Sequence, residues 1–150
     1  VSEFIVLDAP AALFLQVWVG VAAWCDLRSR IIPNLWVVFG LVGGIGFAVS
    51  ASETTHALMG VATAFGIGIV PFALRALGAG DVKASMTVGS FVGALGAIKI
   101  ILATALASGA IAWIWWTFQR FRPSERPSTL PVGVPLALAT WALTASIWLH

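Results

Sequence analysis

Residues 78–83 read Gly-Ala-Gly-Asp-Val-Lys and interrupt two long apolar segments of a 150-residue chain. An acidic side chain at the edge of hydrocarbon is energetically costly, so its presence there indicates a functional use. The two glycines allow a tight turn, tolerant of left-handed backbone, that brings other groups close to the carboxylate. Asp81 is therefore the first candidate functional residue of the chain.

The composition around this stretch is that of an integral membrane protein. Hydrophobic residues make up 60% of the chain and charged residues 9%, far below the roughly 25% charged residues of soluble domains. The expected partner is the lipid bilayer. The length suits one domain, residues 1–150, with several spans, because a helix needs about 20 residues to cross the hydrocarbon.

The net charge of +2 does not indicate nucleic-acid binding, because the eight Lys and Arg residues lie beside the apolar segments as topology signals. A lone cysteine, Cys25, can form neither an internal disulfide nor a CxxC zinc site. No metal or organic cofactor is implied. The beginning of the chain carries Glu3 and Asp8 instead of the basic region of a cleavable signal peptide.

The apolar segments predict an all-α membrane helical bundle of about six crossings. They lie at residues 9–25, 35–52, 57–73, two within 84–119, and 130–149. Lys99 and the glycines at 93 and 96 are expected at the turn between the fourth and fifth. Asn34 is a candidate N-cap of the second helix, and Gly40 and Gly44 have the GxxxG spacing of close helix packing.

Alternating crossings set the orientation. If Arg28 and Arg30 are cytoplasmic, every other cation except Lys99 falls on the same side, and both termini lie outside. Five tryptophans then fall near the inner boundary, at positions 24, 36, 113, 115 and 116, whereas Trp18 and Trp141 lie deeper as packing residues. The same alternation of crossings places Asp26 at the membrane face and depth of Asp81, although the orientation was assigned from the cations alone.

Two carboxyl groups that share a site cannot both ionise easily, so one holds a proton while the other is charged. Such a pair can activate water and protonate an amide leaving group without a covalent intermediate. Helix dipoles favour Asp81, at a helix start, as the initial base and Asp26, at a helix end, as the proton holder, although the titration belongs to the pair.

Structural explanations compete with the catalytic one. Asp81 alone fits a helix N-cap, and Asp26 alone fits an ion pair with Arg28 or Arg30. Lys83 is either a topology anchor or a residue that tunes the charge of Asp81 or positions a substrate. Residues 131–135, Pro-Val-Gly-Val-Pro, either begin the last helix or open it for an extended peptide.

Three motifs in order resemble the type IV prepilin peptidases, which are GxGD-type membrane aspartyl proteases. They are Asp26 followed by Ile32-Pro33-Asn34, then residues 78–83, then residues 130–135. The resemblance implies that Asp26 and Asp81 are the catalytic acids of an endopeptidase. It also implies supporting or substrate-binding roles for the other motif residues, namely Gly78, Gly80, Lys83, Pro33, Asn34, Pro131 and Gly133.

The resemblance further implies a multi-pass protein of a bacterial inner membrane that cuts at the cytoplasmic face. Its substrate would be a pilin-like precursor, whose short basic leader is removed just before its hydrophobic helix. With one Cys and no cysteine-rich insertion after the first span, the methyltransferase activity of the larger members is not carried over. The compact form is similar to the short peptidases of tight-adherence (Flp) pilus systems.

Two other functions use the same residues differently. A small transporter or proton relay would carry ions through Asp26 and Asp81, and would need further polar residues along a transmembrane path. The spans offer mainly Ser, Thr and Gln16. A structural membrane subunit would tolerate asparagine at both positions.

Overall fold

The computed structural model describes residues 8–29, 32–75, 77–120, 135–136 and 138–142. These residues form helices and no strand: α1 (Ala9–Ser29), α2 (Asn34–Ser50), α3 (Thr54–Ala73) and α4 (Ala79–Arg120), with helical turns at 135–136 and 138–142. The all-α prediction is confirmed for this part of the chain.

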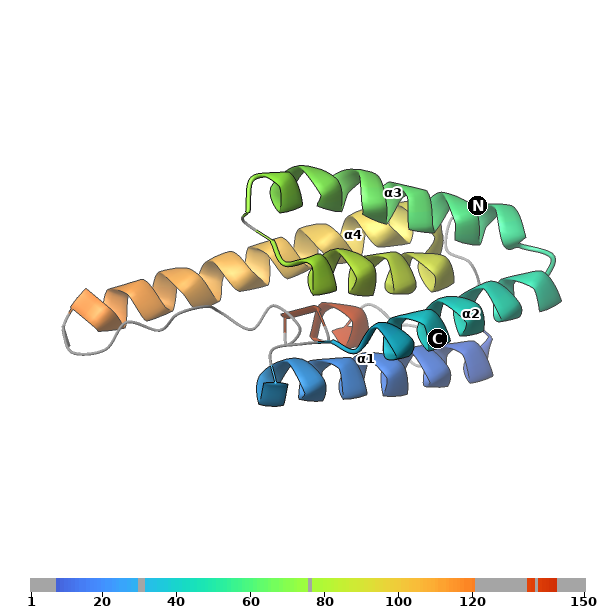
Figure 1. Cartoon of the computed structure of the whole chain (residues 1–150), viewed down its shortest axis with the longest axis horizontal. Coiled ribbons are helices and arrows are strands. Elements are labelled where there is room, and N and C mark those ends of the chain that lie inside the picture. Colours follow the sequence, from blue (N-terminus) through green and yellow to red (C-terminus); the bar gives the residue numbers. More distant parts are fainter. Residues whose placement is uncertain (1–7, 30–31, 76, 121–134, 137, 143–150) are drawn as a thin grey trace.

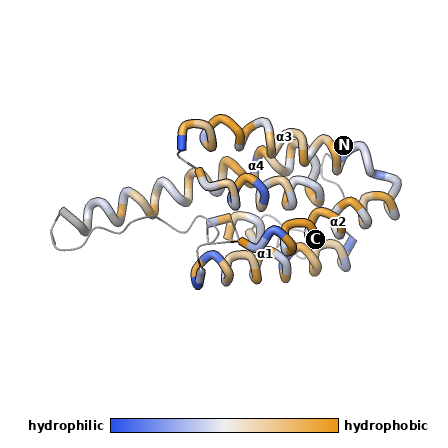
Figure 2. Tube along the Cα trace, viewed as in Figure 1, coloured by the Kyte–Doolittle hydropathy of each residue, from blue (hydrophilic) through white to orange (hydrophobic). Residues whose placement is uncertain are grey.

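Successive helices run in alternating directions, as Figure 1 shows. The connections at residues 30–33 and 51–53 are short, and short connections make neighbouring helices antiparallel. The ends of α1 and α3 therefore lie at the same end of the bundle as the starts of α2 and α4. Arg28, Arg75 and Lys83 share this end, as the orientation predicted. Figure 2 shows that hydrophilic positions gather near the helix ends, whereas the helix bodies are hydrophobic.

Among the described residues, α1, α3 and the 79–114 part of α4 are long and apolar enough for a membrane, by length and composition; α4 contains a break, described below. α2 is apolar but shorter. Large hydrophobic side chains such as Val17, Val42 and Leu106 are exposed on the outer faces, as in a bundle that meets lipid. The protein is thus a membrane protein. The predicted count of six spans is not established, because most of residues 130–149 and both termini lie outside the described residues.

α4 is broken at Gly93, which has φ 70° and ψ −175°. Glycine adopts a positive φ without the steric cost that a Cβ imposes. The ribbon of α4 turns back there, so residues 79–92 and 94–120 run in opposite directions (Figure 1). A turn in the 93–96 region was predicted. The placement of Lys99 in that turn was wrong, because helical structure resumes directly after Gly93.

Glycines bring the helix backbones into contact. A Cβ added to Gly60 of α3 would overlap the carbonyl oxygen of Gly89 of α4, and one added to Gly89 would meet the carbonyl of Gly60. On α2, an added Cβ would overlap Trp18 at Gly40 and Ser90 at Gly44. The predicted use of the Gly40–Gly44 face for close packing is confirmed.

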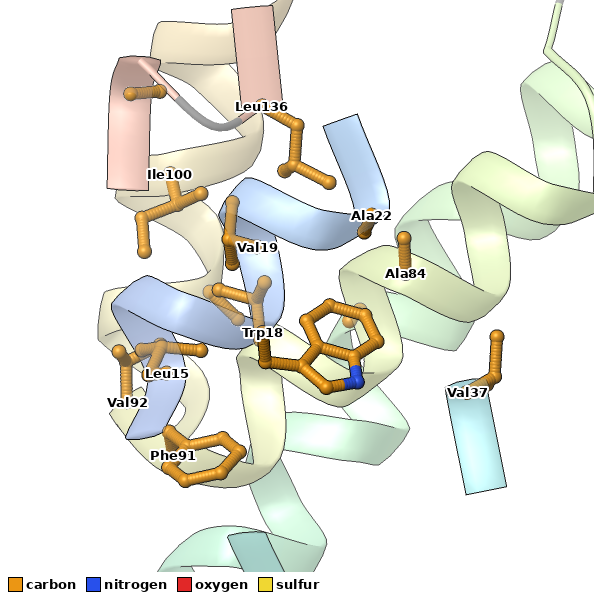
Figure 3. Packing of buried hydrophobic residues seen from close by; sticks show 14 of the residues in the cluster. Leu15, Trp18, Val19, Ala22, Val37, Ala84, Phe91, Val92, Ile100 and Leu136 are labelled. Atoms are coloured by element: carbon orange, nitrogen blue, oxygen red, sulfur yellow. The ribbon is translucent and has the colours of Figure 1, made fainter. Parts of the chain in front are cut away.

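The core lies between α1 and α4. Leu15, Trp18 and Val19 of α1 are buried, and Phe91 and Val92 of α4 face the same cluster (Figure 3). From the last helical turns, Leu136 also packs into this cluster. Trp18 is therefore a packing residue, as predicted.

Two tryptophans join α1 to α2. The indole N–H of Trp18 donates to the carbonyl of Trp36 at 2.8 Å, and the indole N–H of Trp36 donates to the carbonyl of Trp18 at 3.2 Å. Their rings are parallel, with centroids 6.4 Å apart. Both indole donors thus have a partner within the bundle, which matters in a medium without other partners.

Four further tryptophans whose side chains are described have large exposed fractions. Trp24, Trp113 and Trp116 are exposed on the outer faces, where an aromatic belt would place them. Trp141, predicted as a packing residue, is 46% exposed, although its indole N–H donates to the carbonyl of Gln16 at 3.3 Å. Its ring thus bridges the last helical turns to α1 from the surface.

Candidate active site

Asp26 occupies a core-facing position in the last turn of α1. It continues the buried stripe formed by Leu15, Trp18, Val19 and Ala22, whose spacing is that of one helix face. Only 9% of Asp26 is exposed, whereas the neighbouring Leu27 and Arg28 are exposed. Helical periodicity therefore directs this carboxyl group into the bundle.

Asp81 is the third residue of α4. Its Oδ2 accepts a hydrogen bond from the backbone N–H of Gly78, just before the helix, at 3.3 Å. The carboxylate thus satisfies a free N–H of the helix start and lies at the positive end of the helix dipole. Asp81 is therefore not the N-cap of α4, because it lies inside the helix. Its Oδ2 does satisfy the N–H of Gly78, and its other oxygen remains available for reaction.

The two acids lie near enough to each other to interact. An electrostatic interaction couples the side chains of Asp26 and Asp81, although 55 positions separate them in the sequence. The antiparallel arrangement explains this, because α1 ends and α4 begins at the same end of the molecule (Figure 1). The geometry supplies a pair of interacting carboxyl groups at one end of an apolar helical bundle.

The glycines around Asp81 act differently from expectation. Gly93 is the glycine with a positive φ in the described part of the chain, so neither Gly78 nor Gly80 adopts a left-handed conformation. Arg75 has a φ of 58° instead, directly after α3. Gly78 matters for space: a Cβ there would lie 3.2 Å from Asp81 Oδ2. The glycine lets the carboxylate fold back onto the backbone.

Gly80 is less constrained. A Cβ there would lie 3.9 Å from Ile32, an ordinary contact distance. Ile32 itself is buried and belongs to the connection between α1 and α2. The first turn of α4 therefore rests against the segment that follows Asp26.

Lys83 and Asn34 bind each other. The ammonium group of Lys83 donates to the amide oxygen of Asn34 at 2.9 Å. The prediction of Asn34 as an N-cap was wrong: Pro33 occupies that position, without a side-chain cap, and Asn34 is the first residue of α2. Its side-chain oxygen accepts the hydrogen bond from Lys83 instead. Within the described residues, Lys83 forms no ion pair with either aspartate.

A sequence model of the type IV leader peptidase family matches residues 13–114. The chain belongs to this family. The match includes Asp26, Pro33, Asn34 and the 78–83 stretch. No curated protein and no solved structure matches the chain.

As a member of the type IV leader peptidase family, this membrane protein is a peptidase. The matched residues end before Pro131 and Gly133, which lie outside the described residues. The helical turns that follow them are packed in place, since Leu136, Ala139 and Thr140 are buried. The predicted opening at residues 131–135 stays a prediction.

An apolar groove lies between α3 and the first turns of α4. It holds about 340 Å³ and is lined by Phe65, Ile69 and Phe72 of α3 and by residues of α4 on both sides of Asp81, namely Ala79, Val82, Lys83 and Met86. Among the described residues, no three His, Cys, Asp or Glu side chains gather where they could hold a metal ion.

The sequence did not reveal two residues that build the site. Ile32 was noted only as part of a motif, yet it contacts the first turn of α4. Trp36 was expected in an aromatic belt, yet it fastens α2 to α1 through Trp18. Helical periodicity would have placed Trp18 on the buried face of α1, but nothing in the pattern names its partner.

Proposed function

We propose that this protein is an aspartic endopeptidase in which Asp26 and Asp81 act as one catalytic pair. It would remove the leader peptide from Flp-like type IV prepilin precursors at the cytoplasmic face of a bacterial inner membrane. The observation that carries the proposal is that Asp26 and Asp81, from distant parts of a chain in a leader peptidase family, lie at the same end of the helical bundle, where their side chains interact electrostatically.

The pair can hydrolyse a peptide bond with balanced proton transfers. The ionised aspartate removes a proton from water as the water oxygen bonds to the carbonyl carbon, and the protonated aspartate gives its proton to the carbonyl oxygen. When the C–N bond breaks, the leaving amine takes the proton that the first aspartate had removed from water. The newly formed carboxyl group returns the other proton to the second aspartate. The pair ends with the one proton with which it began.

Two features support the orientation and substrate class. The basic residues Arg28, Arg75 and Lys83 share the end that carries the acids, which favours the cytoplasmic side for it. The connection at residues 30–33 is short, so no further domain is inserted after α1. That compact arrangement is what the resemblance to Flp-type peptidases implies.

A proton relay is less well supported. The buried hydroxyl groups of Thr87, Ser90 and Thr104 donate to backbone carbonyls of their own helix, at distances of 3.2, 2.7 and 2.7 Å. Hydroxyls engaged in this way satisfy their own helix instead of forming a chain between helices. The peptidase is therefore the function we propose.

Cleavage of a purified precursor tests the proposal. The protein in lipid nanodiscs is incubated with a precursor that carries a short basic leader before its hydrophobic helix, and the products are identified by mass spectrometry. Asp26→Asn and Asp81→Asn should each abolish cleavage, because asparagine keeps the shape but cannot transfer the proton. Asp8→Asn, at the exposed start of α1, is the matched control and should cleave normally. Activity retained by either of the first two variants would refute the pair.

A further inference from the structure

A side-chain hydrogen bond links the two motif-bearing segments of the site. Lys83, two residues after Asp81, donates to Asn34, the first residue of α2, at 2.9 Å. We propose that this bond positions Asp26 relative to Asp81, an inference that rests on the proposed peptidase function. Lys83 and Asn34 are then positioning residues, which act through the acids and not on the substrate.

The position of Asp26 relative to Asp81 depends on how α1 is joined to α4. Buried side chains of α1 pack directly against those of α4 in the core. α1 is also fastened to α2 by the reciprocal hydrogen bonds of Trp18 and Trp36, and α2 in turn packs against α4. The second of these connections runs through α2, and the start of α2 is where Asn34 meets Lys83.

The segment after Asp26 also touches α4 through Ile32, which packs against Gly80. That contact is apolar and non-directional, so it holds the segment close without setting its register. A hydrogen bond from an ammonium group to an amide oxygen is directional and stronger than a neutral one. The bond between Lys83 and Asn34 supplies the register that packing alone does not.

The alternative role for Lys83 is to tune the charge of the acids. Within the described residues, Lys83 forms no ion pair with either aspartate, and its partner is a neutral amide. The two roles make different predictions. Charge tuning would shift the pH profile of cleavage when Lys83 is neutralised, whereas a positioning role lowers the rate at every pH.

A double-mutant cycle separates the roles. The variants are Lys83→Met, Asn34→Leu and the two combined, with Asn34→Asp as the conservative change that keeps an acceptor. Each single variant should lower kcat about tenfold with KM unchanged, which is the effect of one lost hydrogen bond to a charged group. The double variant should fall no further, and Asn34→Asp should stay within about threefold of wild type. Lys99→Met, an exposed lysine on the same helix, is the control and should cleave normally.

Losses that multiply to about a hundredfold in the double variant would show independent roles and overturn the inference. Normal kcat in Asn34→Leu, a change confined to KM, or a pH profile shifted only in Lys83→Met would overturn it as well. The wild-type arm separates this inference from the proposed function. A wild-type protein that leaves the precursor intact overturns the function and the positioning role together, whereas an active wild type with multiplying losses overturns the positioning role alone.

Discussion

The helices that carry the two candidate catalytic acids are packed into the bundle to very different extents. Asp81 begins a helix whose backbone touches that of α3 at Gly60 and Gly89. Asp26 ends a helix whose backbone comes close to α2 and to α4 at far fewer places; that helix is held by buried side chains and by the Trp18–Trp36 hydrogen bonds. One acid thus lies on a tightly packed pair of helices, and the other lies on a helix held by side-chain packing and hydrogen bonds. We expect stability to depend on the first support and catalytic geometry on the second.

Disrupting the packing of α3 against α4 should cause the largest loss of stability. Gly60→Ala places a methyl group on the carbonyl of Gly89, and backbone cannot move aside as a flexible side chain can. We expect a loss of more than about 3 kcal/mol of stability and little folded protein. Thermal unfolding and size-exclusion chromatography in detergent measure this.

The matched control is Gly66→Ala in the same helix, where an added Cβ has open space. It should leave the fold intact, with a gain of up to about 1 kcal/mol from helix propensity. If Gly60→Ala is as stable as Gly66→Ala, the close packing of α3 against α4 does not hold Asp81 in place.

Weakening the link between α1 and α2 should have an intermediate effect. Trp18→Phe removes the 2.8 Å hydrogen bond to the carbonyl of Trp36 and leaves unfilled volume in the core. We expect a stability loss of about 2 kcal/mol and a lower cleavage rate, because Asp26 lies on the loosened helix. Trp24→Phe, at a site that is 64% exposed, should change stability by less than about 0.5 kcal/mol. Equal effects of the two changes would contradict the role of Trp18.

A smaller change at the acid itself separates geometry from stability. Gly78→Ala would place a Cβ 3.2 Å from Asp81 Oδ2, so the carboxylate must shift by a few tenths of an ångström. We expect cleavage to fall about tenfold, because a displacement of about 1 Å costs a catalytic group about a hundredfold. The melting temperature should hardly change. Wild-type kcat in this variant would show that the position of Oδ2 is not critical.

Gly80→Ala should have the smallest effect, although it lies in the same motif. The added Cβ would meet Ile32 at 3.9 Å, which is normal packing, and Gly80 is in regular helix. Cleavage within about twofold of wild type is expected. A severe loss in this variant would mean that the second glycine of the motif serves the substrate and not the fold.

Much of this arrangement was predictable from the sequence. Long apolar segments and the alternation of their ends predict the helices and bring Asp26 and Asp81 to the same end, because direction follows from short connections. The packing role of Gly40 and Gly44 was also predictable from their spacing. The role of the aspartates as catalysts remains a prediction.

The partners of polar side chains were not predictable. Asn34 has the residue type of an N-cap, but the rotation of α2 about its axis turns it toward Lys83. Trp18 and Trp36 find each other because two helices meet at a particular register, which a hydrophobic pattern does not encode. In α4, the sequence is apolar on both sides of Gly93, so the pattern does not show at which residue the first half ends. The backbone conformation of Gly93 sets that boundary.

The most direct test of the central claim is the single-turnover rate of precursor cleavage by wild type, Asp26→Asn, Asp81→Asn and the double variant. If the two acids act as one unit, each single variant falls to the same background rate as the double variant, because half of a pair cannot complete the proton transfers. A double variant that is slower than both singles by the product of their losses would show independent roles and contradict a shared catalytic pair.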